Sequence, residues 1–384
     1  MAAASAHDIA MNIRRARAAA GITQEAAAAA AGLSRAGYRS LEAGESEPRA
    51  RTVLALADGL KVKPADLLTP APPLPQARFR SLKRLNDRDS VLLKVAGQLD
   101  DYAALENLLG ERFEYALKGL SFADSLREAR AEVAADIVRK KLGLKEDEPV
   151  RDIGGLLEER AGIKVLRLDV QTDAFFGLSI GEGDGGPAVV VNTWGRISVE
   201  RWIFTAAHEL GHLCLHGEDF DPGLSEEIEQ SEREANLFAG QFLMPHAAFI
   251  REWDQAAGLA FYWRVLKVKR IFHVSYKTVL YRLQEHGLQG VWQRFQVDAR
   301  RHTGKALTKS EEPHALRRDA FGWGNPEPSK AREPGGLAVV DFAPDRRYRL
   351  VREAVDRGAI SLGRGAEILG LPLVQMKSLQ ASWV

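Results

Sequence analysis

A pair of histidines four residues apart restricts this chain more than any other feature of its sequence. The stretch FTAAHELGHLCLH contains His208 and His212, and Glu209 directly follows the first histidine. On an α-helix residues i and i+4 share a face, so both imidazoles can point at one metal ion. Glu209 then lies beside that ion, where its carboxylate can accept a proton from water. The pattern predicts a hydrolytic zinc helix; the alternative is two hydrogen-bonded histidines on an amphipathic helix.

A catalytic zinc ion takes three protein ligands, so one more is needed. His216 follows His212 by one turn, but successive turns of a straight helix spread their side chains along its axis. The stretch SEREANLFAGQFLMP offers Glu232 and Glu234, and the small Ala235 would let a second helix approach the zinc helix closely. We predict Glu232 as the third ligand, with Glu234 as the alternative. The expected cofactor is one Zn²⁺ ion, with Mn²⁺ as the ion that could replace it.

Bulk composition excludes several classes of protein. A net charge of +1 over 384 residues excludes a general polyanion binder, so any nucleic-acid contact must come from a local patch. The single cysteine, Cys214, excludes an intramolecular disulfide and fits a reducing compartment. The sequence has neither the shape of a signal peptide nor an apolar run long enough to span a membrane. We therefore expect a cytoplasmic protein with no membrane partner.

Changes in composition divide the chain into five segments. The prolines of TPAPPLPQARF favour an extended spacer directly after the first segment. We expect a helix-turn-helix domain at 8–70, a linker and helical connector at 71–145, a zincin-like peptidase domain at 146–290, a flexible linker at 291–345 and a C-terminal helical segment at 346–384. The expected fold class is mainly α with a small β-sheet, which belongs to an α+β domain around the HExxH helix.

The first segment has the helix signals of a helix-turn-helix bundle. Thr23 can cap a helix through the alanines, Gly32 can adopt the positive φ of a tight turn, and Ser34 can cap the next helix. That next helix, RAGYRSLEAG, would be the recognition helix. The expected core consists of Ile13, Ala27, Leu33, Leu41, Val53 and Leu56. Gly37 weakens the recognition helix, which leaves a bundle used only for protein contact as the alternative.

This segment resembles the XRE, or lambda-repressor-like, family, including an E-x-G-x-x-x-P ending at Glu42, Gly44 and Pro48. The resemblance implies double-stranded DNA as a partner. It also implies the residues in contact with DNA: Gln24 against a backbone phosphate, and Arg35, Ala36, Tyr38 and Arg39 facing the major groove.

A second resemblance covers roughly residues 150–290. RWIFTAAHELGHLCLH, then EREANLFAGQFLMP, preceded by FGLSIGEGDGGPAVVVN, resembles the ImmA/IrrE family of zinc metallopeptidases in order and spacing. The resemblance implies a small zincin fold with His208, His212 and Glu232 on zinc and Glu209 as the catalytic residue. Members of that family cleave a specific helix-turn-helix repressor and so derepress genes for stress response or mobile-element transfer. The strand AVVVN is expected to be an edge that pairs with an extended substrate.

Two classes of function therefore compete. The leading one is a site-specific zinc endopeptidase and transcriptional regulator that cleaves a repressor or antitoxin-like protein. The alternative is a DNA-binding transcription factor whose zincin-like domain senses a ligand without proteolysis, although such a sensor has no chemical need for Glu209. An antitoxin that binds a toxin through its C-terminal helices is a third reading. A second copy of the chain, forming a homodimer, is a further candidate partner.

One part of the predicted site has no single candidate. A peptidase needs a group that stabilises the oxyanion of the transition state. His246, His273, Tyr276 and Tyr281 all follow the zinc helix in the sequence, and the sequence does not choose among them.

Overall fold

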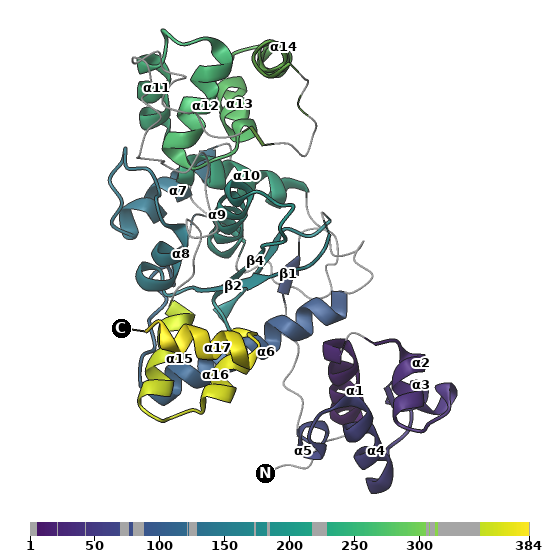
Figure 1. The fold of residues 1–384 in the computed structure, drawn as a ribbon. Coiled ribbons are helices and arrows are strands. Elements are labelled where there is room, and N and C mark those ends of the chain that lie inside the picture. Colours follow the sequence, from purple (N-terminus) through teal and green to yellow (C-terminus); the bar gives the residue numbers. More distant parts are fainter. Residues whose placement is uncertain are drawn as a thin grey trace. The chain divides into compact units, whose positions relative to one another are not determined.

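The computed structural model of the protein describes most of the chain as two compact units (Figure 1). The first unit comprises residues 1–75 and 86–98, and the second comprises 76–85 and 99–384. The described residues are 6–20, 22–42, 44–69, 77–79, 88–120, 122, 129–172, 174–182, 185–216, 229–304, 307, 312–313 and 346–383. Residues 70–76 of the proline-rich spacer and most of 304–345 in the predicted flexible linker lie outside them.

Five short helices form the N-terminal bundle. They are α1 (Ala6–Ala20), α2 (Gln24–Ala30), α3 (Arg35–Glu42), α4 (Ala50–Leu60) and α5 (Pro64–Leu67). The predicted caps are confirmed: the Thr23 hydroxyl accepts a hydrogen bond from the Ala26 amide, and the Ser34 hydroxyl accepts one from the Gly37 amide, both at 3.1 Å. Gly32 has the predicted positive φ, at 64°. The helix-turn-helix reading of this segment therefore agrees with its local structure.

The bundle has a small apolar core and one buried ionic cluster. The core includes Ile13, Ala27, Leu41, Val53 and Leu56 as predicted, and Leu33 packs against it. The sequence reasoning missed the ionic cluster. Glu42 is buried and accepts hydrogen bonds from the Arg17 guanidinium at 2.7 Å and from the Gln24 amide at 2.8 Å. This carboxylate therefore joins α3 to both α1 and α2.

The second unit contains one four-stranded sheet. Its strands are β1 (Ala77–Phe79), β2 (Lys164–Leu168), β3 (Gly177–Ile180) and β4 (Ala188–Asn192), in the order β1-β3-β4-β2. β4 is parallel to β2 and antiparallel to β3, and β1 is antiparallel to β3. Every residue of β4 is buried, which fits its uninterrupted run of valines. The prediction that AVVVN is an exposed edge is wrong, because β4 has a hydrogen-bonded strand on each side.

Helices cover this sheet and carry the candidate site (Figure 1). They are α7 (Arg130–Lys141), α8 (Ile153–Gly155) with the π-helical turn η3 (Leu156–Arg160), α9 (Val199–Leu215) and α10 (Glu229–Leu243). α9 lies against β3 and β4, α10 packs along α9, and α7 packs against α10. The Ser198 hydroxyl caps α9 as predicted, accepting a hydrogen bond from the Arg201 amide at 3.3 Å. The expected class, mainly α with a small sheet, is confirmed.

The core of this unit reaches beyond the predicted range 146–290. The later helices are α11 (His246–Gln255), α12 (Phe261–Phe272), α13 (Tyr276–Glu285) and α14 (Val291–Thr303). α7 contributes Ala134 and Val138 to the core, and α14 contributes Phe295 and Ala299. Residues 291–303 are therefore a packed helix, where the sequence had suggested the start of a flexible linker. None of the described helices is long and apolar enough to cross a lipid bilayer.

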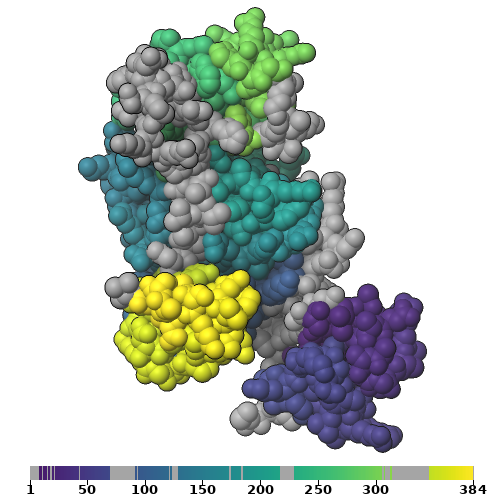
Figure 2. Space-filling view, viewed as in Figure 1, coloured from purple at the N-terminus to yellow at the C-terminus, as the bar shows by residue number. Residues whose placement is uncertain are grey.

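Three C-terminal helices form a compact cluster (Figures 1 and 2). They are α15 (Arg346–Asp356), α16 (Leu362–Leu369) and α17 (Leu373–Ala381). The long α6 (Arg88–Leu109) contacts this cluster through its second half. The cluster has its own small core, in which Met376 lies 3.0 Å from the position that a Cβ at Gly365 would occupy. A side chain at Gly365 would therefore press on Met376, so glycine favours the close packing of α16 and α17.

Arg346, at the start of α15, ties this cluster to the second half of α6 and to η3. Its guanidinium donates to Glu106 Oε1 at 2.7 Å and to the Glu111 carbonyl at 2.6 Å, and its amide donates to Glu158 Oε2 at 3.2 Å. The Tyr102 hydroxyl donates to the other oxygen of Glu158 at 3.0 Å. Burial raises the pKa of Glu158 to about 7, although these hydrogen bonds lower it. The C-terminal segment is thus anchored by a buried ionic network.

We expect Arg346→Ala to destabilise the second unit by about 3–5 kcal/mol, because buried carboxylates lose their main partner. Arg349→Ala is the matched control, since its ion pair with Glu111 is 2.9 Å long but the arginine side chain is 45% exposed. Its expected effect is about 1 kcal/mol or less. Urea unfolding followed by circular dichroism measures both changes. Equal losses for the two variants would contradict the anchoring role of Arg346.

Candidate functional site

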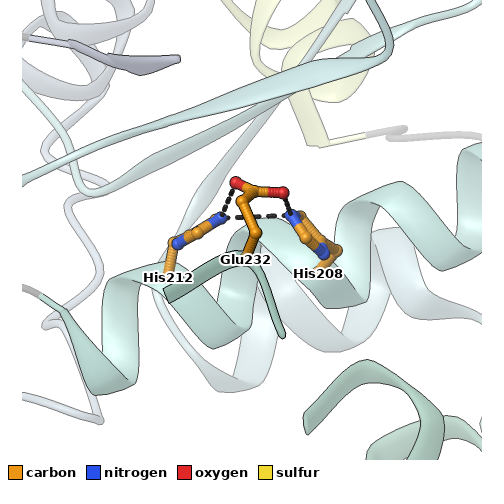
Figure 3. Close-up of side chains that lie close together, drawn as sticks. All are labelled: His208, His212 and Glu232. Carbon is orange, nitrogen blue, oxygen red and sulfur yellow. Dashed lines mark hydrogen bonds and ion pairs between the residues drawn. The ribbon is translucent and has the colours of Figure 1, made fainter. Parts of the chain in front are cut away.

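Three side chains from two helices converge beside the sheet (Figure 3). His208 and His212 lie on one face of α9 and are 1% and 4% exposed, and Glu232 reaches them from α10. The two Nε2 atoms are 3.1 Å apart. Glu232 Oε1 lies 3.1 Å from His212 Nε2, and Oε2 lies 3.5 Å from His208 Nε2. The predicted trio therefore comes together.

The geometry of this trio fits a tetrahedral metal ion. Zinc bonds of about 2.0–2.1 Å at tetrahedral angles place ligand atoms about 3.3 Å apart, close to the three separations observed. Two imidazole nitrogens and a carboxylate oxygen are also a donor set that zinc accepts. Within the part of the chain that the structure describes, this is the one group of three or more His, Cys, Asp or Glu side chains close enough to hold an ion. These residues fit the expected cofactor.

Close packing of two helices brings Glu232 to the histidines. Ala235 is fully buried, as its predicted role requires. On α9, a Cβ at Gly211 would lie 3.0 Å from Cδ1 and 3.2 Å from Cβ of Phe238. A Cβ at Gly211 would therefore press on Phe238 of α10, so that the close contact between the two helices depends on the glycine. The sequence reasoning identified Ala235 but missed Gly211.

The alternative ligands, His216 and Glu234, form a second layer behind His212. His216 Nδ1 lies 3.1 Å from His212 Nδ1, and His216 Nε2 lies 3.2 Å from Glu234 Oε2. Glu234 also faces Arg130 Nη1 at 3.4 Å. Burial raises the pKa of Glu234, but hydrogen bonds from Gln230 and His216 outweigh this and lower it. Glu234 is therefore connected to the trio through His216, which lies between it and His212.

This chain of contacts is consistent with one arrangement of protons. A histidine that offers Nε2 to an ion carries its proton on Nδ1, which His212 can donate to His216. His216 then carries its own proton on Nε2 and donates it to the Glu234 carboxylate. Each partner thereby favours the tautomer of His212 that leaves Nε2 free of a proton.

Glu209 is buried where the sheet crosses the zinc helix. A Cβ at Gly177, the first residue of β3, would lie 2.4 Å from Thr205 Cγ2 and 3.4 Å from Glu209 Cγ. Only glycine lets the strand pass this close to α9. Glu209 is therefore enclosed between the two elements, one residue from His208. The sequence reasoning missed Gly177, although a glycine at the start of a β-run signals such an approach.

The four candidates for oxyanion stabilisation lie on α11–α13 or at their ends. His246 packs on the ring of His286 at 4.5 Å, and Tyr276 stacks on Phe295 at 4.8 Å. His273 ends α12 in the left-handed conformation, with φ of 53°. Tyr281 is 59% exposed and lines a hollow beside the zinc helix. Tyr281 is thus the only one of the four that lines this hollow.

The predicted DNA-contacting residues divide into two groups. Arg35, Ala36 and Arg39 are exposed on α3, as a recognition surface requires. Tyr38 is fully buried in the bundle core, so the prediction that it faces the groove is wrong. Its aromatic ring is part of a core that otherwise consists of alanine and aliphatic side chains. Gln24 is half-buried and donates to Glu42, as described above.

Comparison with protein families agrees with both halves of this description. Residues 158–284 match the model of the IrrE N-terminal-like domain, Peptidase_M78. Residues 13–67 match the model of a helix-turn-helix family, HTH_3. No curated protein matches the chain. The first match contains all of the convergent side chains, and the second contains the exposed face of α3.

The chain therefore joins an N-terminal helix-turn-helix domain of the XRE type to an IrrE N-terminal-like domain of the Peptidase_M78 family.

Proposed function

We propose that this protein is a zinc-dependent, site-specific endopeptidase and a DNA-binding transcriptional regulator. The observation that carries the proposal is the convergence of His208, His212 and Glu232 with Glu209 buried on the same zinc helix. A metal site used only for structure has four protein ligands, whereas a catalytic site keeps one position open. Three convergent ligands and an adjacent carboxylate are the composition of a hydrolytic site.

In this proposal His208, His212 and Glu232 hold the ion. A zinc ion held there would act as a Lewis acid that polarises a peptide carbonyl and lowers the pKa of water. Glu209 accepts the proton that water loses as it attacks the carbonyl carbon, and then delivers that proton to the leaving amine nitrogen. The enclosure of Glu209 under Gly177 keeps its carboxylate oriented for both transfers.

His216 and Glu234 serve as positioning residues for His212. Their contacts of 3.1 Å and 3.2 Å fix the ring orientation and the tautomer of that ligand. Arg130 holds this second layer in place, because it donates to the Leu215 carbonyl at 2.8 Å and faces Glu234.

The N-terminal domain gives the regulator its DNA contact. Arg35, Ala36 and Arg39 project from α3 into solvent and would enter the major groove, while Gln24 lies at the start of α2, where such domains approach a phosphate. The net charge of +1 means that this local surface, rather than the whole chain, must supply the attraction to DNA.

The proposed substrate is a repressor or antitoxin-like protein with a helix-turn-helix domain. Cleavage of such a protein would derepress stress-response or mobile-element genes. The fusion of a DNA-binding domain to the peptidase domain supports this choice, because it could bring the enzyme to operators at which such a substrate is bound. The alternative, a regulator whose zincin-like domain senses a ligand without proteolysis, gives Glu209 no chemical role.

The direct test is to replace Glu209. Glu209→Gln should retain zinc and reduce cleavage by at least about 100-fold, because general-base catalysis is lost while the ligands remain. We would compare protein termini in host cells that carry the wild type or this variant, before and after stress. Glu229→Gln is the control, since Glu229 begins α10 and its side chain is 92% exposed. Identical termini with wild type and Glu209→Gln would favour the sensor instead.

Zinc affinity distinguishes the ligand from the positioning residue. Glu232→Ala should cause the larger loss of zinc affinity, because it removes a ligand. Glu234→Ala should weaken zinc binding by about 10- to 100-fold, the usual effect of removing a residue that orients a metal ligand. Titration with a chromogenic chelator measures both. If Glu234→Ala costs more than Glu232→Ala, the two assignments must be exchanged.

DNA binding depends on the exposed face of α3. Arg39→Ala should weaken binding to an operator obtained by selection from random DNA by about tenfold, the value of one good base contact. Zinc content should not change. Arg51→Ala on α4 is the matched control, because Arg51 is also exposed but lies outside the recognition helix. Fluorescence anisotropy gives the affinities, and an unchanged affinity for Arg39→Ala would overturn the recognition-helix assignment.

A further inference from the structure

A cavity of about 880 Å³ lies between the first half of α9, α10 and α13. This volume is within the range of binding sites for small ligands, and it is ample for a peptide side chain with its neighbours. Its walls combine aromatic rings with basic groups, and Phe176, Trp194 and Phe204 supply rings on the α9 side. Nothing in the catalytic chemistry proposed above uses this cavity, which we call the basic pocket.

Residues that line the basic pocket lie one helical turn from the metal site on both helices that carry the proposed ligands. On α9, Arg201 and Phe204 line the pocket and share a helical face with His208, with the rings of Phe204 and His208 6.5 Å apart. On α10, Asn236 lines the pocket one turn after Glu232. A peptide bound at the metal site would therefore have a neighbouring side chain beside the pocket.

β1 shows how an extended backbone lies beside this site. It runs antiparallel to β3, with Phe79 opposite Leu178, so its carboxyl end points toward Gly177. Gly177 lies over Glu209, and Phe176, the preceding residue, lines the basic pocket. An extended backbone that runs alongside β1 in the same direction would therefore approach the metal site and the pocket.

The charge of the pocket is strongly positive. Five basic side chains line it, against two acidic ones, and these are Arg196, Arg201, Arg233, Lys277 and Arg282, with Glu285 and Glu312. Arg282 pairs with Glu285 at 3.0 Å. Burial lowers the pKa of Lys277, and the positive charge of Arg201 lowers it further, while Glu312 raises it. Arg201 and Lys277 are thus close enough to repel each other, and an anion between them would relieve that repulsion.

Aromatic rings hold two of these cations in fixed places. The guanidinium of Arg201 lies over the ring of Phe176 at 4.3 Å, and that of Arg196 lies over the ring of Trp194 at 5.2 Å. Stacking of this kind fixes the plane of a guanidinium, a group whose N–H donors match the geometry of a carboxylate. The positive groups are therefore preorganised before any ligand arrives.

We propose that the basic pocket is a specificity site that receives an acidic side chain, Asp or Glu, next to the peptide bond at the metal centre. This inference rests on the proposed peptidase function and names the chemistry of its substrate. It explains why a peptidase of this kind would cut few proteins: an extended backbone alone carries little sequence information, and the pocket adds a charge requirement.

The test uses the full-length, zinc-loaded Glu209→Gln variant, which is expected to bind a peptide without cutting it. The probes are two pools of fluorescein-labelled decapeptides with the same fixed residues. Their variable positions hold only Asp and Glu in one pool and only Lys and Arg in the other. Anisotropy at physiological salt should show binding of the acidic pool at least about tenfold tighter than that of the basic pool.

Two further variants locate this preference. Lys277→Glu should abolish or reverse it, and Arg196→Glu, at an exposed position that the fold tolerates, should reduce it several-fold. Arg151→Glu makes the same charge change at an exposed residue outside the pocket and should leave it unaltered. An equal effect of Arg151→Glu, or equal binding of both pools, would overturn the proposal.

Peptide binding and the comparison of protein termini together distinguish a failure of the pocket proposal from a failure of the peptidase proposal. If acidic peptides bind preferentially but protein termini are identical with wild type and Glu209→Gln, the pocket stands and proteolysis fails. If new termini arise without an acidic residue near the cut, and the pools bind equally, the peptidase stands and the specificity pocket is wrong.

Discussion

The candidate site depends on how closely α10 packs against α9. Gly211 leaves room for the ring of Phe238, which a Cβ at this position would approach to 3.0 Å, and the small Ala235 is fully buried on α10. This contact holds Glu232 within 3.5 Å of both histidine nitrogens. A looser pairing would leave two histidines on a helix without a third ligand. The proposed metal site therefore depends on helix packing.

Sequence spacing was sufficient to predict the features that depend on local helical structure. The shared face of the i, i+4 histidines and the caps at Thr23, Ser34 and Ser198 follow from helical geometry. Features that depend on tertiary packing were missed or mistaken. The position of β4 inside the sheet depends on its parallel pairing with β2, a strand about twenty residues earlier in the chain, as well as on its pairing with β3. Residue type gave no sign that Tyr38 would fill a core otherwise made largely of alanine and small aliphatic side chains.

Buried polar groups were the hardest to anticipate. Glu234 and Glu232 are two residues apart with the same chemistry, yet one faces His216 and the other faces both ligand histidines. The distinction comes from the orientation of α10, which a single sequence does not specify. Arg346 also donates hydrogen bonds to Glu106 and Glu158, which are far away in the chain. These contacts make the C-terminal helices part of the second unit. The second unit is therefore larger than the segment 158–284 that matches the IrrE N-terminal-like domain.

X-ray absorption at the zinc edge of the full-length protein would identify the atoms that bind the proposed metal ion. We expect one zinc ion per chain, bound by two imidazoles and a carboxylate oxygen. The signal of one imidazole should disappear in His212→Ala, while His216→Ala should keep two. A wild-type spectrum with three imidazoles would place His216 on the metal and contradict the assignment of Glu232. The absence of bound zinc in the wild-type protein would contradict the metal centre itself.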